Sequence, residues 1–108
     1  MGGKIDKARD LILALPSGER AQAAGIVFQI GHPVADAGDD KSAGPIMELV
    51  VEFWPNHYMA LYHAGASEFD LGQGDLARQH LESFLQYYHE NDGWRSNAID
   101  MLQKLGAR

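Results

Sequence analysis

The sequence predicts an all-α fold in which antiparallel helix–turn–helix hairpins stack on one another, with about six helices in total. Apolar residues recur at helical spacing in six segments, and no segment shows the strict alternation of a β-strand. Part of this pattern repeats after 34 residues, which is the signature of stacked helical repeats. The connections between the segments are mostly short, which favours antiparallel neighbours.

The repeat is clearest between segments 43–54 and 77–88, which both carry apolar or small residues at i, i+4, i+7, i+8 and i+11. These residues are Ala43, Met47, Val50, Val51 and Trp54, and then Ala77, Leu81, Phe84, Leu85 and Tyr88. The same offset of 34 residues relates four further pairs, Gly31 and Gly65, Asp36 and Asp70, Gly38 and Gly72, and Glu48 and Glu82. The two segments are therefore expected to occupy equivalent places in the stack.

The first two helices are predicted at 4–15 and 18–31. Pro16 ends the first, because the residue before a proline is disfavoured in the α region. The end of the second is less clear, because Gly31 followed by Pro33 reads as a stop signal. The 34-residue period would instead extend this helix to about residue 35. We expect it to end near Gly31 or to kink.

The remaining elements follow in order. Segment 35–42 is rich in turn-forming residues and is predicted to be a loop. Helices are predicted at 43–54, 57–71, 74–89 and 94–105. Asn56 is a suitable N-cap for the 57–71 helix. That helix is apolar on most sides, so it is either buried between its neighbours or presents a binding face.

Composition narrows the classes of function. The chain has 108 residues and no cysteine, which excludes disulfides and thiolate metal sites and is typical of a reducing compartment, so we expect a cytoplasmic protein. The N-terminal residues do not resemble a signal peptide, and no apolar run is long enough to span a membrane. The net charge is −6, with no basic patch for nucleic acid. No Lys or Arg lies between Lys41 and Arg78, so this stretch presents either ordinary solvated faces or an acidic surface for a basic partner.

The segment 61–84 resembles the tetratricopeptide repeat (TPR), a 34-residue helix–turn–helix unit. The matching residues are Leu61, Ala64, Gly65, Phe69, Gly72 and Ala77, with Leu81 where a bulky residue is usual. The preceding repeat matches at Val27, Ile30, Gly31, Gly38 and Ala43, and closes with Pro55 and Asn56. His89 departs from the family's repeat-ending proline. The resemblance implies one domain, 1–108, forming a short right-handed TPR-like superhelix. Its parts are an N-terminal helix and the start of the second (4–23), an irregular repeat 1 (24–57), repeat 2 (58–91) and a capping helix (92–108).

The resemblance also implies a concave groove that binds a peptide. The groove residues expected by resemblance are Phe28, His32, Met59, Tyr62, Ala66, Phe69 and Asp70. The family's carboxylate-clamp form uses Lys and Asn in the groove, and this chain lacks them there, so we reject that function. Alternatively, several of these aromatic residues belong to the core or are covered by the N-terminal helix. The tryptophans and Tyr88 at helix ends are expected to seal hairpin junctions rather than bind a ligand.

No catalytic or metal-binding constellation stands out. The five histidines, His32, His57, His63, His80 and His89, include no i, i+4 pair, so we expect surface or packing roles. Glu48 and Glu52 are i, i+4 on one helix, but they lack the histidine companion of di-iron bundles. The segment 72–74 is an inter-helix turn rather than a phosphate loop, and no serine has a nucleophile-elbow context. We therefore expect no enzyme, no cofactor and no metal.

Three functions remain as hypotheses. The first is an interaction module whose groove binds a protein or peptide segment with basic or apolar residues. The second is structural self-association, as a homodimer or by repeat stacking, through the apolar 57–71 helix. The third and weakest is a helical metal-binding protein or enzyme that uses Glu48, Glu52 and nearby histidines. Binding to nucleic acid or to a membrane is not expected.

Overall fold

The computed structural model describes residues 2–38 and 40–106, with the side chains of residues 3–38 and 42–106. Over these residues the regular structure is entirely helical. The helices are α1 (Gly2–Leu13), α2 (Arg20–Asp36), α3 (Asp40–Phe53), α4 (Tyr58–Asp70), α5 (Gly74–Tyr87) and α6 (Gly93–Gly106), with a short 3-10 helix, η1 (Ser17–Glu19), before α2. The predicted all-α fold of six helices is confirmed. Residues 1, 107 and 108 of the predicted domain lie outside the described residues.

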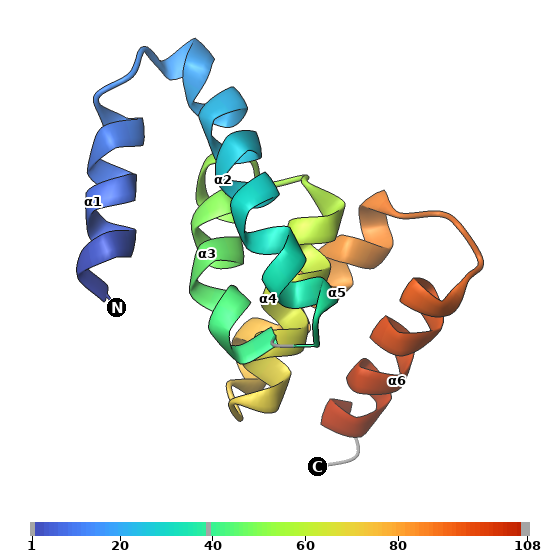
Figure 1. Cartoon of the computed structure of the whole chain (residues 1–108). Helices are drawn as coiled ribbons and strands as arrows, with labels where there is room; N and C mark the ends of the chain where they lie inside the picture. The colour runs from blue at the N-terminus through green and yellow to red at the C-terminus, as the bar shows by residue number, and fades with distance from the viewer. Residues whose placement is uncertain (1, 39, 107–108) are drawn as a thin grey trace.

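The helices pack in chain order across a molecule of 42 × 28 × 24 Å. In Figure 1, α1 lies at one side of the molecule, α6 lies at the other, and α2 to α5 fill the space between them. The central helix, α4, packs against both α3 and α5. Among the described residues, no helix is both long and apolar enough to cross a membrane.

The 34-residue period of the sequence reappears as a repeated helix contact. A Cβ atom on Gly31 of α2 would lie 2.6 Å from Ile46 and 3.4 Å from Met47 of α3. At the equivalent place in the next hairpin, a Cβ atom on Gly65 of α4 would lie 2.7 Å from Leu81 of α5. Met47 and Leu81 are themselves 34 residues apart, and both are fully buried. The two hairpins therefore use the same close approach, which only glycine permits.

The turns of the two hairpins are also equivalent. Gly38 follows α2 with a φ of 89°, and Gly72 follows α4 with a φ of 79°. Glycine adopts this left-handed conformation without the steric cost that a side chain would add, so it ends helices in this position. The glycine that follows α2 and the glycine that follows α4 thus share a left-handed φ.

The expected stop at Gly31 is wrong, because α2 continues through Pro33 to Asp36. A proline inside a helix typically costs about 3 kcal/mol. Tertiary packing offsets this cost, because Gly31 and Ala35 on either side of the proline are buried. The last turn also remains hydrogen-bonded, since the N–H of Ala37 donates to the carbonyl of Pro33 over 3.1 Å. The repeat period was the better guide here than the local stop signal.

Two further expectations need correction. The predicted loop 35–42 is too long, because α2 continues to Asp36 and α3 begins at Asp40. Of the predicted loop, residues 37 and 38 lie outside the helices, and residue 39 lies outside the described residues. The first turn of α3 is polar in sequence, so apolar periodicity could not detect it. The N-cap of α4 is His57 rather than Asn56, since Nδ1 of His57 accepts the N–H of Ala60 over 3.3 Å.

Helix α4 is buried between its neighbours rather than left with a free apolar face. Every residue from Ala60 to Glu68 is buried. Ala60 and Ala64 join a core cluster with α2 and α3, whereas Leu61 and Tyr62 join a second cluster with α5 and α6. Between Ala60 and Glu68, α4 therefore has no exposed apolar face, whereas Tyr58 and Leu71 at the ends of the predicted helix are 45% and 51% exposed.

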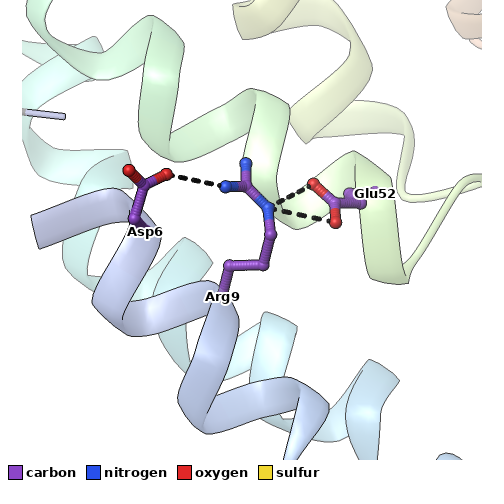
Figure 2. A network of polar contacts seen from close by, with 3 residues as sticks. All are labelled: Asp6, Arg9 and Glu52. Atoms are coloured by element: carbon purple, nitrogen blue, oxygen red, sulfur yellow. Dashed lines mark hydrogen bonds and ion pairs between the residues drawn. The ribbon is translucent and has the colours of Figure 1, made fainter. Parts of the chain in front are cut away.

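Helix α1 packs against α2 and α3 through a small contact. Ile12 is its one buried core side chain among residues 3–13. On the outer side, the guanidinium of Arg9 contacts Glu52 of α3 over 2.9 and 3.1 Å and Asp6 of α1 over 3.0 Å (Figure 2). Glu52 is thus occupied by a structural ion pair that anchors α1.

Candidate functional site

A row of aromatic and histidine rings crosses one face of the stack from α2 to α6. Its members, in spatial order, are Trp54, His57, Phe28, His32, His63 and Trp94. Successive ring centroids lie 4.7, 4.2, 4.8, 5.4 and 5.8 Å apart. These contacts join helices that are far apart in the sequence, so the row depends on the stacking of the hairpins. We refer to this set of rings as the aromatic row.

A hollow of about 580 Å³ opens at the α2 end of the aromatic row. Its walls come from α2 and from the segment between α3 and α4, and its lining residues are Ala21, Gln22, Gly25, Ile26, Phe28, Gln29, Trp54 and His57. Gly25 allows the indole of Trp54 to pack closely against α2, since a Cβ atom at residue 25 would lie 3.1 Å from the ring. Ile26 is 58% exposed, so this hollow carries an apolar side chain that the chain itself does not cover.

A second hollow of about 210 Å³ lies between α4 and α6. Its lining residues are Tyr62, Ala66, Phe69, Asp70, Asn97, Asp100 and Met101. Two carboxylates, Asp70 and Asp100, give it an acidic rim. Asp100 also pairs with Lys104 over 3.0 Å, one turn further along α6. This end of the face therefore offers a negatively charged margin beside aromatic side chains.

The seven expected groove residues are divided between these places. Phe28 lines the first hollow and stacks on His32, while Tyr62, Ala66, Phe69 and Asp70 line the second. Met59 is half-buried against the core cluster of α4, α5 and α6. Tyr62 is only 7% exposed, so it belongs to the core as much as to a surface. The N-terminal helix lines neither hollow.

The aromatic residues at helix ends behave differently from one another. Tyr88 stacks on Phe84 with ring centroids 4.9 Å apart and packs against the core, as expected for a residue that seals a junction. Trp54 and Trp94 each remain 37% exposed and form the two ends of the aromatic row. They are therefore also available to a ligand on this face.

His32, Asp36 and His63 meet in the middle of the aromatic row. Nε2 of His32 lies 3.3 Å from Oδ1 of Asp36, one turn further along α2. His63 reaches the pair from α4, and one ligand-capable atom from each of the three side chains lies within 4.8 Å of the other two. His63 is 2% exposed, whereas the side chains of His32 and Asp36 are 34% and 51% exposed. The group is therefore anchored in the core and open to solvent on one side.

His57 sits next to this group and has an altered protonation equilibrium. Burial lowers the pKa of His57, and the positive charge available to His32 acts in the same direction. The neutral imidazole suits its structural role, because Nδ1 must keep a lone pair to accept the N–H of Ala60. At neutral pH, His57 thus presents an uncharged aromatic ring at the α2 end of the aromatic row.

A separate polar cluster lies inside the stack and joins α3, α4 and α5. Glu68 of α4 is 1% exposed and lies 2.6 Å from Nδ1 of His80 on α5. Burial raises the pKa of Glu48, on α3, to about 7, and both a hydrogen bond to Glu68 and the charge of Glu68 add to the shift. The charge of His80 opposes it. Glu48 therefore gains or loses its proton near neutral pH, beside Glu68 and His80.

The hypothesis that pairs Glu48 with Glu52 at one site is not supported by this arrangement. Glu48 turns toward Glu68 and His80, whereas Glu52 pairs with Arg9 on the outer side. Side chains four residues apart share a helix face only approximately, and here the partners come from different helices, α4 and α5 for Glu48 and α1 for Glu52. The carboxylate that does accompany Glu48 comes from α4, which spacing along one helix could not reveal.

Sequence reasoning placed His32 in the binding groove, but it did not assign Asp36 or His63 to the same group. It compared histidines only with other histidines, and it therefore overlooked the i, i+4 pair of His32 and Asp36. That spacing was a usable signal, because two such residues on one helix turn face the same way. The contribution of His63 depends on how α2 and α4 cross, and no local pattern in the sequence reports that.

Comparison with protein-family models, with curated proteins and with solved structures gives no match to this chain.

Proposed function

We propose that this chain is a helical-repeat interaction module that binds a segment of another protein along the face formed by α2, α4 and α6. The observation that carries the proposal is the aromatic row, whose rings are in continuous contact from Trp54 to Trp94 and whose two end tryptophans are each 37% exposed, although His63 within it is buried. Exposed aromatic and apolar side chains in a hollowed face are typical of protein interaction sites.

The proposed partner segment carries an apolar side chain and basic residues. The apolar side chain enters the first hollow, where Ile26 and Phe28 are available to contact it. The basic residues lie toward the second hollow, beside Asp70 and Asp100. No Lys or Arg occurs in the sequence of α4, so nothing on the central helix repels a cationic segment.

The proposed architecture is a short, right-handed TPR-like superhelix of two repeats with flanking helices. The repeated glycine contacts and the repeated left-handed turns support this assignment, because they recur at the 34-residue spacing of that family. In such stacks the first helix of each hairpin lines the concave side, and here those helices are α2 and α4. Four members of the aromatic row lie on α2, α4 and α6, and the other two, Trp54 and His57, lie in the segment between α3 and α4.

A peptide selection tests the proposed face. A random library of 15-residue peptides is selected on the intact chain in the presence of a chelator, and the affinity of enriched peptides is measured by fluorescence anisotropy. Ile26→Gln should weaken binding by roughly tenfold or more, because burying a large apolar side chain contributes about 1.5–3 kcal/mol. Leu76→Gln is the matched control, since Leu76 is an exposed apolar residue of α5 (43% exposed) that lines neither hollow.

The composition of the selected peptides gives a second readout. We expect enrichment of an apolar residue followed by Lys or Arg, and binding that weakens as salt is added. Peptides that bind the Ile26→Gln variant as tightly as the parent chain would refute the proposed face. So would an equal loss of affinity in the Leu76→Gln control.

A further inference from the structure

His32, Asp36 and His63 have the chemistry of a transition-metal site. Two imidazole nitrogens and one carboxylate oxygen form a ligand set that zinc commonly uses, and three protein ligands leave a fourth position open. Calcium and magnesium prefer oxygen ligands only, so this set discriminates against them. We infer that the chain binds one divalent transition-metal ion of the zinc type through these three side chains. This inference goes beyond the proposed peptide binding and does not depend on it.

The observed distances are close to those that coordination needs. Ligands at about 2.0–2.1 Å from a tetrahedral metal lie roughly 3.4 Å from one another. Nε2 of His32 and Oδ1 of Asp36 already lie 3.3 Å apart, and one ligand atom from each of the three side chains lies within 4.8 Å of the other two. A contraction of at most about 1.4 Å therefore completes the geometry. His32 and Asp36 are half-exposed, so their side chains have room to make it.

The surroundings of His63 hold its ring in place. Tyr62 and Trp94 pack against it edge to face, with ring centroids 5.3 and 5.8 Å away. The ring of His63 is thus held in place before binding, so this ligand loses little side-chain freedom when the metal binds. Asp36 also contributes a negative charge. On α2 and α4 the one basic residue is Arg20, which lies at the opposite end of α2 and donates to the carbonyls of Leu13 and Leu15.

The repeat provides an internal comparison for this site. Residues 34 positions later are Ala66, Asp70 and Asn97, and all three line the second hollow. The equivalent place between α4 and α6 therefore keeps the carboxylate but has lost both imidazoles. Asp70 is consequently a matched control for Asp36, since the two residues share a position in the repeat but only Asp36 has histidine companions.

Titration with Co²⁺ and Zn²⁺ tests the inference on the tag-free, full-length chain. Isothermal titration calorimetry should show one ion bound per chain, and bound Co²⁺ should give the visible absorption of a site with nitrogen and oxygen ligands. Asp36→Asn and His32→Gln should each weaken binding by more than about 100-fold, beyond the range typical of changes outside the ligand shell. Asp70→Asn and His89→Gln should leave the affinity unchanged, and Ca²⁺ and Mg²⁺ should not compete.

Circular dichroism checks that each variant remains folded, and both ligand variants replace half-exposed side chains so that folding is preserved. The inference is overturned if the parent chain binds neither ion, or if Asp36→Asn and His32→Gln bind as the parent does. It is also overturned if Asp70→Asn abolishes binding, because the ion would then occupy a different place. A rise in the unfolding temperature with Zn²⁺ that is present in the parent and absent in His32→Gln would support it independently.

Discussion

Replacing Glu48 with Gln should make the chain more stable at neutral and basic pH. Burial and the neighbouring Glu68 raise the pKa of Glu48 from 4.5 to about 7, so the folded chain binds this proton more tightly than the unfolded chain. The free energy of unfolding contributed by Glu48 is therefore complete below pH 4.5 and is lost as the pH rises toward 7. Gln has no proton to lose, so the variant should not show this decline.

The expected size follows from the shift. A rise of the pKa from 4.5 to about 7 corresponds to roughly 3.5 kcal/mol, at about 1.4 kcal/mol for each pH unit. Glu48 is only half-buried, and water screens its interactions, so we expect about 1–2 kcal/mol. For a chain of this length, that difference moves the midpoint of urea unfolding by roughly 1 M.

The assay compares urea unfolding of the parent chain and of Glu48→Gln at pH 4.5, 5.5, 6.5 and 7.5, followed by circular dichroism. The informative quantity is the difference between the two proteins at each pH, because other titrating groups contribute equally to both. Glu82→Gln is the control. Glu82 occupies the equivalent place in the repeat but is exposed on α5, so its replacement removes a charge without touching the buried cluster.

This prediction would be refuted if the difference in the free energy of unfolding between Glu48→Gln and the parent chain stayed constant from pH 4.5 to 7.5. It would equally be refuted by a difference that favours the parent chain as the pH rises, because the folded state would then prefer the ionised carboxyl. If Glu82→Gln gained the same free energy of unfolding over the parent chain as the pH rises, net charge rather than the cluster around Glu68 would set the pH dependence.

Two further predictions concern the packing of α4 against α5 and the attachment of α1 to α3. Gly65→Ala should destabilise the chain by about 1–3 kcal/mol, because the new Cβ would lie 2.7 Å from Leu81 in the tightest contact of the second hairpin. Gly93→Ala is its control in the same thermal unfolding experiment, since no atom lies within 4 Å of the added carbon. If Gly65→Ala proved as stable as Gly93→Ala, the close approach of Gly65 to Leu81 would be contradicted. Arg9→Ala should change the free energy of unfolding little, because the ion pair to Glu52 is exposed, yet it should speed amide hydrogen exchange in α1 relative to α4. Unchanged exchange in α1 would show that this ion pair does not anchor the helix.

Much of the fold followed from the sequence because it depends on features that are local or periodic. The stripe shared by Met47 and Leu81 and the paired glycines report helix faces and turns, and these features repeat in the structure. The expectation that the second helix ends near Gly31 failed for a different reason. A local stop signal competed with a tertiary contact, and the burial of Gly31 and Ala35 decided the outcome. Propensity within one segment cannot contain that information.

The site was less predictable, because its chemistry comes from residues that meet only after the helices cross. Phe28 and His32 were expected on the binding face, and the structure places them in the aromatic row. His63 joins them from α4 at a distance that no spacing rule along one helix could supply. In the same way, the resemblance to a repeat family could point to positions that face the groove but could not show that Tyr62 is also part of the core.

The two hairpins separate the residues that hold the fold from the residues that give this chain its own chemistry. Positions that are the same in both, such as Gly31 and Gly65, lie at helix crossings and turns, where any repeat of this geometry needs them. Positions at which either the residue or its surroundings differ carry the unusual groups. Glu48 is half-buried beside Glu68, whereas Glu82 at the equivalent place is exposed. His32 faces His63, whereas Ala66 at the equivalent place faces an acidic hollow. If the stack alone were required, these costly buried and paired groups would have no reason to differ between the hairpins, so the asymmetry is where binding and proton exchange should be sought.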